Sequence, residues 1–489
     1  MSSRSTKRHR VTPVGPARPP VAVEHPAGPE ARGVAARLFA PVDIASLVFF
    51  RIMVGVILAW EVIRYFDHGW IARYWIRPDF HFTYYGFEWV KPWPGIGMYV
   101  HFAVLGLAAV GIALGWRYRL SATIFAIAFP YVFLLEQATY LNHFYMLCLL
   151  GALMPFLPLH RAWSIDADRN PRLRSDTAPV WVLWVLRLQI GIVYTFGGIA
   201  KLNPDWLRGE PMRTWLAERT DFPVIGPLFV HEPVVWGFTY GGLLLDLLLV
   251  PALLWRRTRP FAFLAAVSFH LLNARLFQIG IFPWFMLAAT TLFFDPDWPR
   301  RLLGRKPVRL PAAPDLRWTP RRRLAAGVLA TFFAVQLLLP LRHHLYPGDV
   351  NWTEEGHRFS WHMKLRDKNI ADARFVVIDG AGDTLKVLAA KDVMPRWMRN
   401  RVLIRPDMVQ QLAHHLAERE RRAGHDDVQV HAVVRASLNG RPPQFLIDPA
   451  VDLAAQPRSW RTASWIVPLN DPGLETQGVT RAGDDDPGE

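Results

Sequence analysis

Several chemistries depend on residues that this sequence lacks. Its 489 residues include one cysteine, Cys148, which excludes an intramolecular disulfide framework, a cysteine-rich zinc site and a cysteine-ligated iron–sulfur cluster. No Gly-rich phosphate loop, H-E-x-x-H zinc pattern or G-x-S-x-G nucleophile elbow occurs. We therefore expect no metal centre. Charged residues are also scarce, at 20% of the chain.

Apolar and aromatic residues are abundant instead. They include 21 Trp and 30 Phe, and the apolar share is 51%. This composition excludes disorder throughout and predicts that many side chains face membrane lipid. The net charge of +15 suits nucleic acid, anionic lipid or cytoplasmic membrane loops. No zinc-finger, helix-turn-helix or RNP pattern supports a nucleic-acid partner, so we expect none.

The apolar runs predict a polytopic α-helical membrane protein of the cell membrane. A spanning helix needs about 20 apolar residues. One helix from Phe261 to Phe294 would exceed a core of about 30 Å, so two helices hinged near Gly280 and Pro283 are expected there. With these two the predicted spans number nine; the others cover residues 43–65, 97–115, 120–138, 143–159, 179–200, 234–254 and 324–341.

The loop charges predict the orientation of these spans. With a cytoplasmic N-terminus, the inside loops carry 18 Lys and Arg and the outside loops carry 8. Residues 1–38 are then a disordered basic cytoplasmic tail and not a signal peptide, because no short apolar region with a cleavage site appears. Residues 39–341 form the transmembrane domain.

Residues 342–470 are predicted to form an extracytoplasmic α+β domain. Residues 375–378 and 385–388 form a strand pair around Asp379-Gly380, and a helix capped by Asp407 follows. Residues 428–438 alternate as a strand before an Asn439-Gly440 hairpin turn and a strand over 444–448. The acidic tail, 471–489, is predicted to be disordered.

Three polar clusters interrupt the spans and are candidate functional residues, because ionisable groups in a membrane are costly. All three fall toward the outer half of the membrane, where a shared cavity could form. Each also has a structural interpretation: Lys201 as a snorkelling lysine paired with Asp205, the histidines as core residues that bond between helices, and Trp206 as an interfacial aromatic. The candidates are Asn142, His143, Tyr145, Lys201, Trp206, His270 and Asn273.

A lysine in an apolar cavity offers specific chemistry. Desolvation lowers the pKa of a lysine amine, which makes the neutral amine available as a base. A nearby histidine and asparagines could orient a substrate or stabilise an anion. These residue types suit proton abstraction from a lipid-soluble acid.

At these residues the sequence resembles the vitamin K-dependent gamma-carboxylase family, whose membrane part is the HTTM domain. The resemblance runs from about Asp43 to Leu469. It rests on the order of several separated motifs, which are LNHFYMLCLL, GGIAKLNPDW, SFHLLNARLFQIGIF, DPDWPRRL, NWTEEGHRFSWHMKLRDK, RPDMVQQLAHHLA and SLNGRPPQFLIDPAVDLA.

The resemblance implies an enzyme that uses vitamin K hydroquinone, from phylloquinone or menaquinone, with O2 and CO2. Lys201 matches the family's base in an A-K-L-x-x-D-W context, and His143 matches its active-site histidine in an N-H-x-Y context. The polar clusters supply the residues that are predicted to bind substrate, which are Asn142, Tyr145, Trp206, His270 and Asn273. The quinol and O2 would give a strongly basic oxygenated intermediate that removes a γ-proton from a protein or peptide glutamate, which adds CO2 as the cofactor leaves as the epoxide.

The sequence also departs from the family's animal members. One cysteine cannot form their disulfide, the domain after the membrane is shorter, and no propeptide-docking surface is recognisable. Epoxidation without glutamate carboxylation is therefore an alternative. A quinone oxidoreductase without carbon chemistry is another, and a transporter or membrane scaffold is a third, although no inverted repeat is seen.

Overall fold

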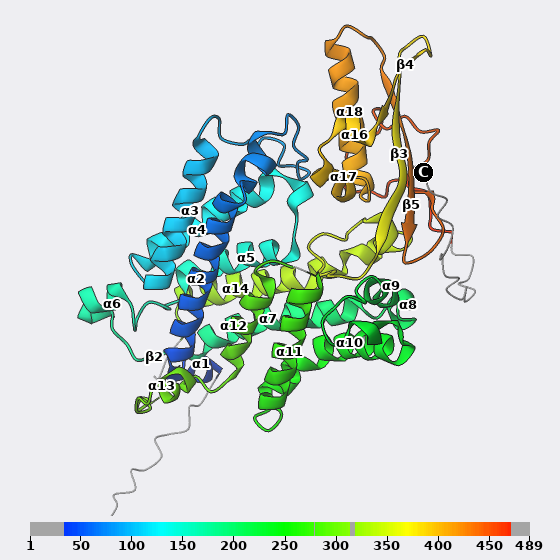
Figure 1. Ribbon diagram of the computed structural model, residues 1–489. Coiled ribbons are helices and arrows are strands. Elements are labelled where there is room, and N and C mark those ends of the chain that lie inside the picture. Colours follow the sequence, from blue (N-terminus) through cyan, green and yellow to red (C-terminus); the bar gives the residue numbers. More distant parts are fainter. Residues whose placement is uncertain (1–33, 278, 313–317, 471–489) are drawn as a thin grey trace, which may run out of the picture.

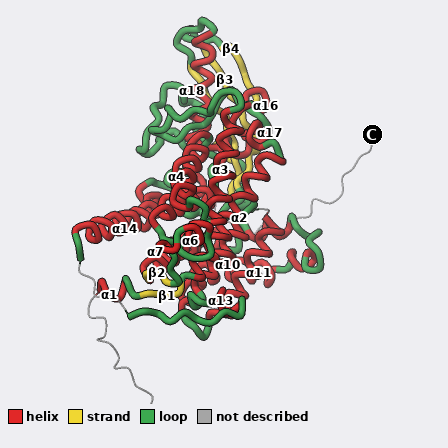
Figure 2. Tube along the Cα trace, turned by 90° about the vertical axis from the view of Figure 1, so that its left-hand side faces the viewer, coloured by secondary structure: helices red, strands yellow, loops and turns green. Residues whose placement is uncertain are grey.

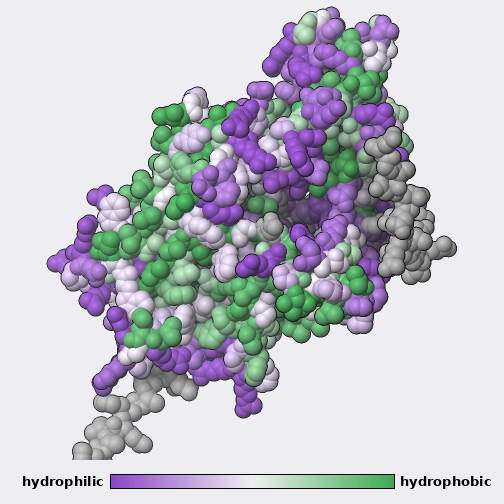
Figure 3. Space-filling model, in the orientation of Figure 1, coloured by the Kyte–Doolittle hydropathy of each residue, from purple (hydrophilic) through white to green (hydrophobic). Residues whose placement is uncertain are grey.

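The computed structural model describes residues 34–277, 279–312 and 318–470. A helical body carries an α/β unit at one end (Figure 1). Figure 3 shows apolar side chains in a broad band over the helical body, whereas hydrophilic side chains gather on the α/β unit and at the opposite end of the body. This distribution agrees with a polytopic membrane protein that has an extramembrane domain.

Seven helices among the described residues are long and apolar enough to cross a membrane. They are α2 (Ala45–Asp67), α3 (Gly97–Leu114), α4 (Tyr118–Leu135), α7 (Val180–Ala200), α10 (Glu232–Leu254), α11 (Arg259–Phe277) and α14 (Pro320–Leu338). Helix α14 is set off to one side of the body in Figure 2, and only 17% of its apolar window is buried.

Two further apolar helices are shorter. They are α5 (Asn142–Leu153) and α12 (Phe282–Thr290), and a 3-10 turn extends them to Phe156 and Phe293. Each of the nine predicted spans therefore corresponds to an apolar helix, but two reach only about 15 to 25 Å at 1.5 Å per residue. The predicted break near Gly280 is confirmed, because α11 ends at Phe277 and α12 begins at Phe282.

Ion pairs place several of the basic loops on one face of the helical body. Arg256, between α10 and α11, and Arg259, the first residue of α11, both contact Asp295 after α12. Arg300 bonds to Asp43 before α2 and to Asp176 before α7. The loops that were predicted to share the inside therefore lie at the same end of the molecule, as the alternation of the spans requires.

Short elements complete this end and the opposite one. Residues 34–38 form helix α1, so the predicted tail is wrong for these five residues; residues 1–33 and 471–489, where the remaining tail predictions fall, lie outside the described residues. The short elements are β1 (Pro41–Asp43), α6 (Ile165–Arg169), β2 (Thr177–Pro179), α8 (Pro204–Leu207), α9 (Met212–Ala217), α13 (Trp298–Leu302) and α15 (Val350–Thr353).

The α/β unit contains a four-stranded antiparallel sheet with strand order β4-β3-β5-β6. The predicted strand pair, the alternating strand and the hairpin are confirmed, although the last strand is only two residues long. Its elements are β3 (Lys368–Ile378), β4 (Thr384–Ala389), α16 (Ala390–Val393), α17 (Arg396–Val402), α18 (Pro406–Arg422), β5 (Gln429–Leu438) and β6 (Gln444–Phe445).

Helix α18 covers the sheet with the apolar face that the sequence predicted. Met408, Leu412 and Leu416 are fully or almost fully buried. The predicted cap is wrong, since Arg405 occupies the N-cap position and Asp407 lies in the first turn. The Asp407 carboxylate instead accepts two hydrogen bonds from Arg358.

Candidate active site

The last turn of α7 carries two glycines that let α10 approach closely. A Cβ on Gly198 would lie 2.7 Å from the Leu247 side chain and 3.0 Å from the Leu247 backbone nitrogen. A Cβ on Gly197 would lie 3.5 Å from a carboxylate oxygen of Asp246. The GG pair therefore brings an acidic side chain of α10 against the end of α7, where Lys201 is the C-cap residue.

The Lys201 amine is buried and ion-paired. Its Nζ donates to Asp246 Oδ2 at 2.6 Å and to the Gly197 carbonyl at 3.2 Å. Both charged side chains are 7% exposed. The Nζ also lies 5.2 Å from the centre of the Trp206 ring, whose Nε1 donates to the Thr239 carbonyl.

The predicted pairing of Lys201 with Asp205 is wrong. Helix α7 ends at Ala200 and α8 begins at Pro204, so the spacing of four residues does not place the two side chains on one helix face. Asp205 instead accepts hydrogen bonds from Arg441 and Asn439 of the α/β unit. Burial alone raises the pKa of Asp205, but these hydrogen bonds and the Arg441 charge bring it below its usual value.

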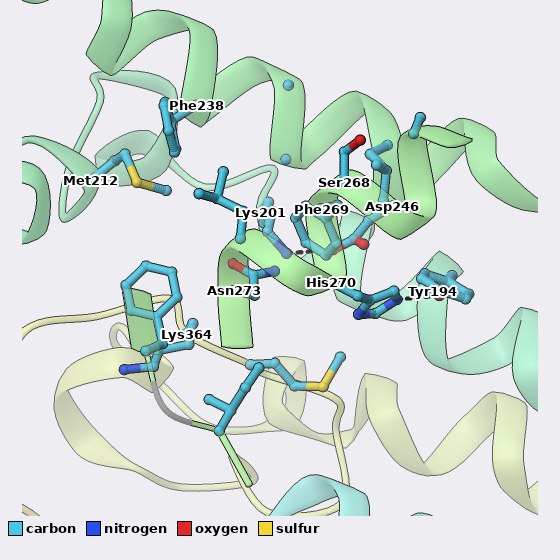
Figure 4. A pocket seen from close by; sticks show the side chains of 18 of the residues that line it. Tyr194, Lys201, Met212, Phe238, Asp246, Ser268, Phe269, His270, Asn273 and Lys364 are labelled. Atoms are coloured by element: carbon cyan, nitrogen blue, oxygen red, sulfur yellow. Dashed lines mark hydrogen bonds and ion pairs between the residues drawn. The ribbon is translucent and has the colours of Figure 1, made fainter. Parts of the chain in front are cut away.

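Lys201 and Asp246 lie on the wall of an apolar cavity of about 570 Å³ (Figure 4). This volume is within the range of roughly 300–1,000 Å³ that is typical of small-molecule sites. A second polar pair lies on the same wall, where the Tyr194 hydroxyl is 2.7 Å from His270 Nε2. The other ring nitrogen of His270 is buried and has no hydrogen-bond partner.

The cavity brings together four of the seven predicted site residues. Lys201, Trp206, His270 and Asn273 all line it, although they come from three helices. Asn142, His143 and Tyr145 do not line it. The His143 ring is stacked on Phe282 at 5.6 Å, and Phe282 lines the cavity and contacts His270 on another side.

Asn142 and Tyr145 contact residues 354–364, which cover the cavity and are called the covering segment below. The Asn142 amide donates to the His362 carbonyl at 2.9 Å, and the Tyr145 ring packs against Trp361 at 5.1 Å. The next two residues, Met363 and Lys364, line the cavity. The first polar cluster thus positions the covering segment and does not contact the cavity itself.

The covering segment has an unusual backbone. Glu354, Phe359, Trp361 and Lys364 all have positive φ angles between 50° and 65°. Such conformations are costly for residues other than glycine and are concentrated at functional sites. Burial lowers the pKa of His362 to about 3, and nearby cationic groups add to this effect, so its ring is neutral beside the cavity.

The sequence interpretation missed Asp246, Tyr194 and Met363. Asp246 gave a signal, since it is a single acidic residue within the apolar run LLLDLLLV. Tyr194 gave no signal, because an aromatic residue in an apolar helix is ordinary. Met363 lies in a quoted motif, but nothing in the sequence shows that it folds over the membrane helices.

Two protein-family models match the chain. The family model for the HTTM domain matches residues 39–298, more than half of the chain, and the model for the lumenal domain of vitamin K-dependent gamma-carboxylase matches residues 321–472. The chain belongs to the vitamin K-dependent gamma-carboxylase family. The lumenal match indicates that the C-terminal region is extracytoplasmic, and it includes α14. No solved structure matches the chain.

Membership of the gamma-carboxylase family indicates a carboxylase that uses vitamin K hydroquinone. The cavity fits a quinol in two respects. Its walls are largely apolar and aromatic, as an isoprenoid naphthoquinol requires. Its wall also carries two separate polar side chains, Lys201 and His270, and the second ring nitrogen of His270 has no hydrogen-bond partner.

Proposed function

We propose that this member of the gamma-carboxylase family oxygenates vitamin K hydroquinone to the epoxide, with Lys201 as the initiating base, and couples this reaction to the carboxylation of glutamate. One observation carries the proposal. The Lys201 amine is buried on the wall of an apolar cavity and its counter-ion, Asp246, is at 2.6 Å. A lysine that only anchored a helix end would extend its amine toward water.

The pair can hold a proton in two places. In an apolar site, transfer of one proton from the ammonium to Asp246 gives a neutral amine and a neutral acid, and neither needs solvation as an ion. The neutral amine then accepts a hydroxyl proton of the quinol. The resulting ammonium lies beside the anionic quinol oxygen, so the cavity as a whole gains no net charge.

Other cavity residues orient the quinol and exclude water. His270, held by the Tyr194 hydroxyl, can bond to the second hydroxyl group, and Asn273 lies one helical turn away on the same face of α11. The Trp206 ring covers the amine. When bound, reduced vitamin K with O2 supplies the strong base that removes the γ-proton of glutamate. Such a base survives only where bulk water is absent.

The proposal also places the protein in the cell membrane with a cytoplasmic N-terminus. The bias of Lys and Arg toward one set of loops supports this orientation. A peptide or protein glutamate would then approach from the extracytoplasmic side. Met363 and Lys364, which lie between the cavity and the α/β unit, are the residues that it would meet.

The test is turnover by the purified protein in lipid nanodiscs. Reduced vitamin K, O2, labelled CO2 and a glutamate-containing peptide are supplied, and epoxide and peptide-bound label are measured separately. We expect both products. Epoxide without label would reduce the proposal to a quinol epoxidase, and the absence of both would contradict the proposal.

Two lysine variants distinguish the base from its neighbour. Lys201→Ala should remove epoxide formation. Lys364→Ala is the matched control, because this lysine also lines the cavity but its amine contacts the Trp215 and Phe277 rings. If Lys201→Ala kept epoxide formation and Lys364→Ala lost it, the base would be Lys364, and the proposal would be contradicted.

A further inference from the structure

We propose that the cavity opens sideways into the membrane between α10 and α11, and that the isoprenoid tail of the quinol occupies this opening while its ring lies beside Lys201. This inference rests on the proposed quinol site. It adds the route by which the substrate enters and the residues that decide which tail lengths are accepted.

Four small residues that line the cavity are at the same time exposed. Gly237 and Gly241 lie on α10, and Ala265 and Ser268 lie on α11. A Cβ added to either glycine would meet nothing within 4 Å. A residue that lines a cavity and is exposed marks its mouth, so the cavity opens along these two helices.

The mouth lies within the depth of the membrane. At 1.5 Å per residue, the four small residues are about 7 to 18 Å from the outer ends of their helices. This is well inside a hydrocarbon core of about 30 Å. Large apolar residues beside them are exposed and mark the lipid-facing surface; they are Leu244 and Leu248 on α10 and Leu264 and Leu271 on α11.

A fifth exposed lining residue, Lys364, lies at the extracytoplasmic end of the cavity. Lys364 packs over the rings of Trp215 and Phe277, which contact each other at 5.4 Å. Met363 lines the cavity beside it. These contacts join α9, the end of α11 and the segment before β3. A charged side chain and two aromatic rings therefore line this end of the cavity, whereas small uncharged residues line the opening between α10 and α11.

The chemistry of the mouth selects the tail and not the ring. The four mouth residues carry no charge, and the neighbouring wall residues Phe238 and Phe269 are aromatic, so the opening suits a hydrocarbon chain. The polar groups that a quinol ring needs, Lys201 and His270, are buried deeper. A membrane-dissolved quinol can therefore insert its ring and leave the tail in lipid, without passing through water.

The experiment narrows the mouth and measures quinone binding, so that it does not depend on turnover. Gly241→Leu is the test variant. Gly327→Leu is the matched control, because Gly327 is an exposed glycine on α14 with nothing within 4 Å of an added Cβ and does not line this cavity. Binding of a menaquinone with one isoprene unit and of one with about four is followed in nanodiscs by quenching of tryptophan fluorescence.

We expect Gly241→Leu to weaken binding of the long-tailed quinone by about tenfold and binding of the short-tailed quinone by less than about twofold. Gly327→Leu should change neither. Equal weakening for both tails would show that residue 241 contacts the ring, and no change for either would show that the tail does not pass between α10 and α11; each result overturns the portal.

The same measurements separate this inference from the proposed function. A wild-type protein that binds quinone with the expected tail dependence but forms no epoxide would retain the portal and lose the catalytic proposal. Normal epoxide formation by Gly241→Leu with the long-tailed quinol, at unchanged KM, would support the catalytic proposal and contradict the portal. A wild-type protein that bound neither quinone would contradict both.

Discussion

The Arg441 guanidinium forms a bidentate ion pair with the carboxylate of Asp205 across the boundary between the α/β unit and the helical body. Nη1 and Nη2 donate to the two carboxylate oxygens at 2.7 and 2.8 Å, and the pair is buried. Asp205 immediately precedes Trp206, which covers the Lys201 amine. The hairpin that follows β5 thus fixes the turn between α7 and α8, which joins Lys201 to Trp206.

We expect this contact to make stability depend on acid pH. The pKa of Asp205 is below its usual value of about 3.9, so its contribution to stability is present above that value and is lost as the pH falls through the lowered pKa. Without Arg441, two of the causes that lower the pKa of Asp205 are lost while the Asn439 hydrogen bond remains, so this contribution becomes smaller. Arg441→Met should therefore lose less stability than the wild type between about pH 5 and 3.

Thermal unfolding in detergent across this pH range measures the difference. Arg461→Met is the control, because Arg461 is an exposed arginine of the same unit. Above pH 5, Arg441→Met should also be less stable by about 3 kcal/mol, since it removes the charged partner of a buried carboxylate. Identical pH profiles for the wild type and Arg441→Met would contradict the assignment.

The sequence predicted the membrane helices well, because a long apolar run is stable in lipid whichever helices it packs against. Strand β5 was also predicted, because its alternating pattern puts every second residue from Val430 to Leu438 in the core, where these residues are fully buried. Partners across the fold could not be predicted. Lys201 is 45 residues from Asp246, and Asp205 is 236 residues from Arg441, so only the packing of α7 on α10 and of the hairpin on α8 pairs them. Local spacing suggested Asp205 for Lys201, but the helix ends between them.

Asp246→Asn should slow epoxide formation. The amide keeps the size of the Asp246 side chain but cannot take up the proton that the Lys201 ammonium transfers in the proposed mechanism. We expect kcat to fall by about tenfold or more, because the proton acceptor beside the amine is lost. The measurement is kcat at saturating quinol.

A double-mutant cycle checks that the two residues act as a pair. Lys201→Met and Asp246→Leu should each destabilise the protein by about 3–5 kcal/mol, whereas the double variant should lose much less, because neither charge is left alone. Additive losses, or an unchanged kcat in Asp246→Asn, would show that Asp246 is only a structural neighbour.

His143→Phe separates ring packing from imidazole chemistry. The His143 ring stacks on Phe282, and a phenyl ring preserves this contact. If the imidazole supports the anionic steps, His143→Phe should reduce epoxide formation by about 100-fold or more while stability changes by less than about 2 kcal/mol. A variant with normal kcat would reduce His143 to a packing residue. Near-UV circular dichroism can verify that its tertiary packing is retained.

Reporter fusions test the orientation. Fusions after Pro260 and after Arg305 should read as cytoplasmic, and a fusion after Gly348 should read as extracytoplasmic. The ion pairs of Arg256 and Arg259 with Asp295 require the first two sites to agree with each other. An extracytoplasmic reading after Arg305 alone would mean that α11 and α12 do not together return the chain to the same side.

The most direct test of the base is Lys201→Arg. An anchor or counter-ion of Asp246 needs only positive charge and length, and arginine supplies both. A base must release its proton, and guanidinium, with a pKa above 12, effectively cannot. We therefore expect Lys201→Arg to fold with nearly wild-type stability, because the ion pair with Asp246 can be kept, and to form almost no epoxide. Raising the pH toward 9 should not restore epoxide formation by Lys201→Arg.

Lys201→Ala should be less stable than Lys201→Arg but equally inactive. A small amine added to the solution should partly restore epoxide formation by Lys201→Ala and not by Lys201→Arg. Substantial epoxide formation by the arginine variant would refute the base assignment, whatever the burial of the wild-type amine.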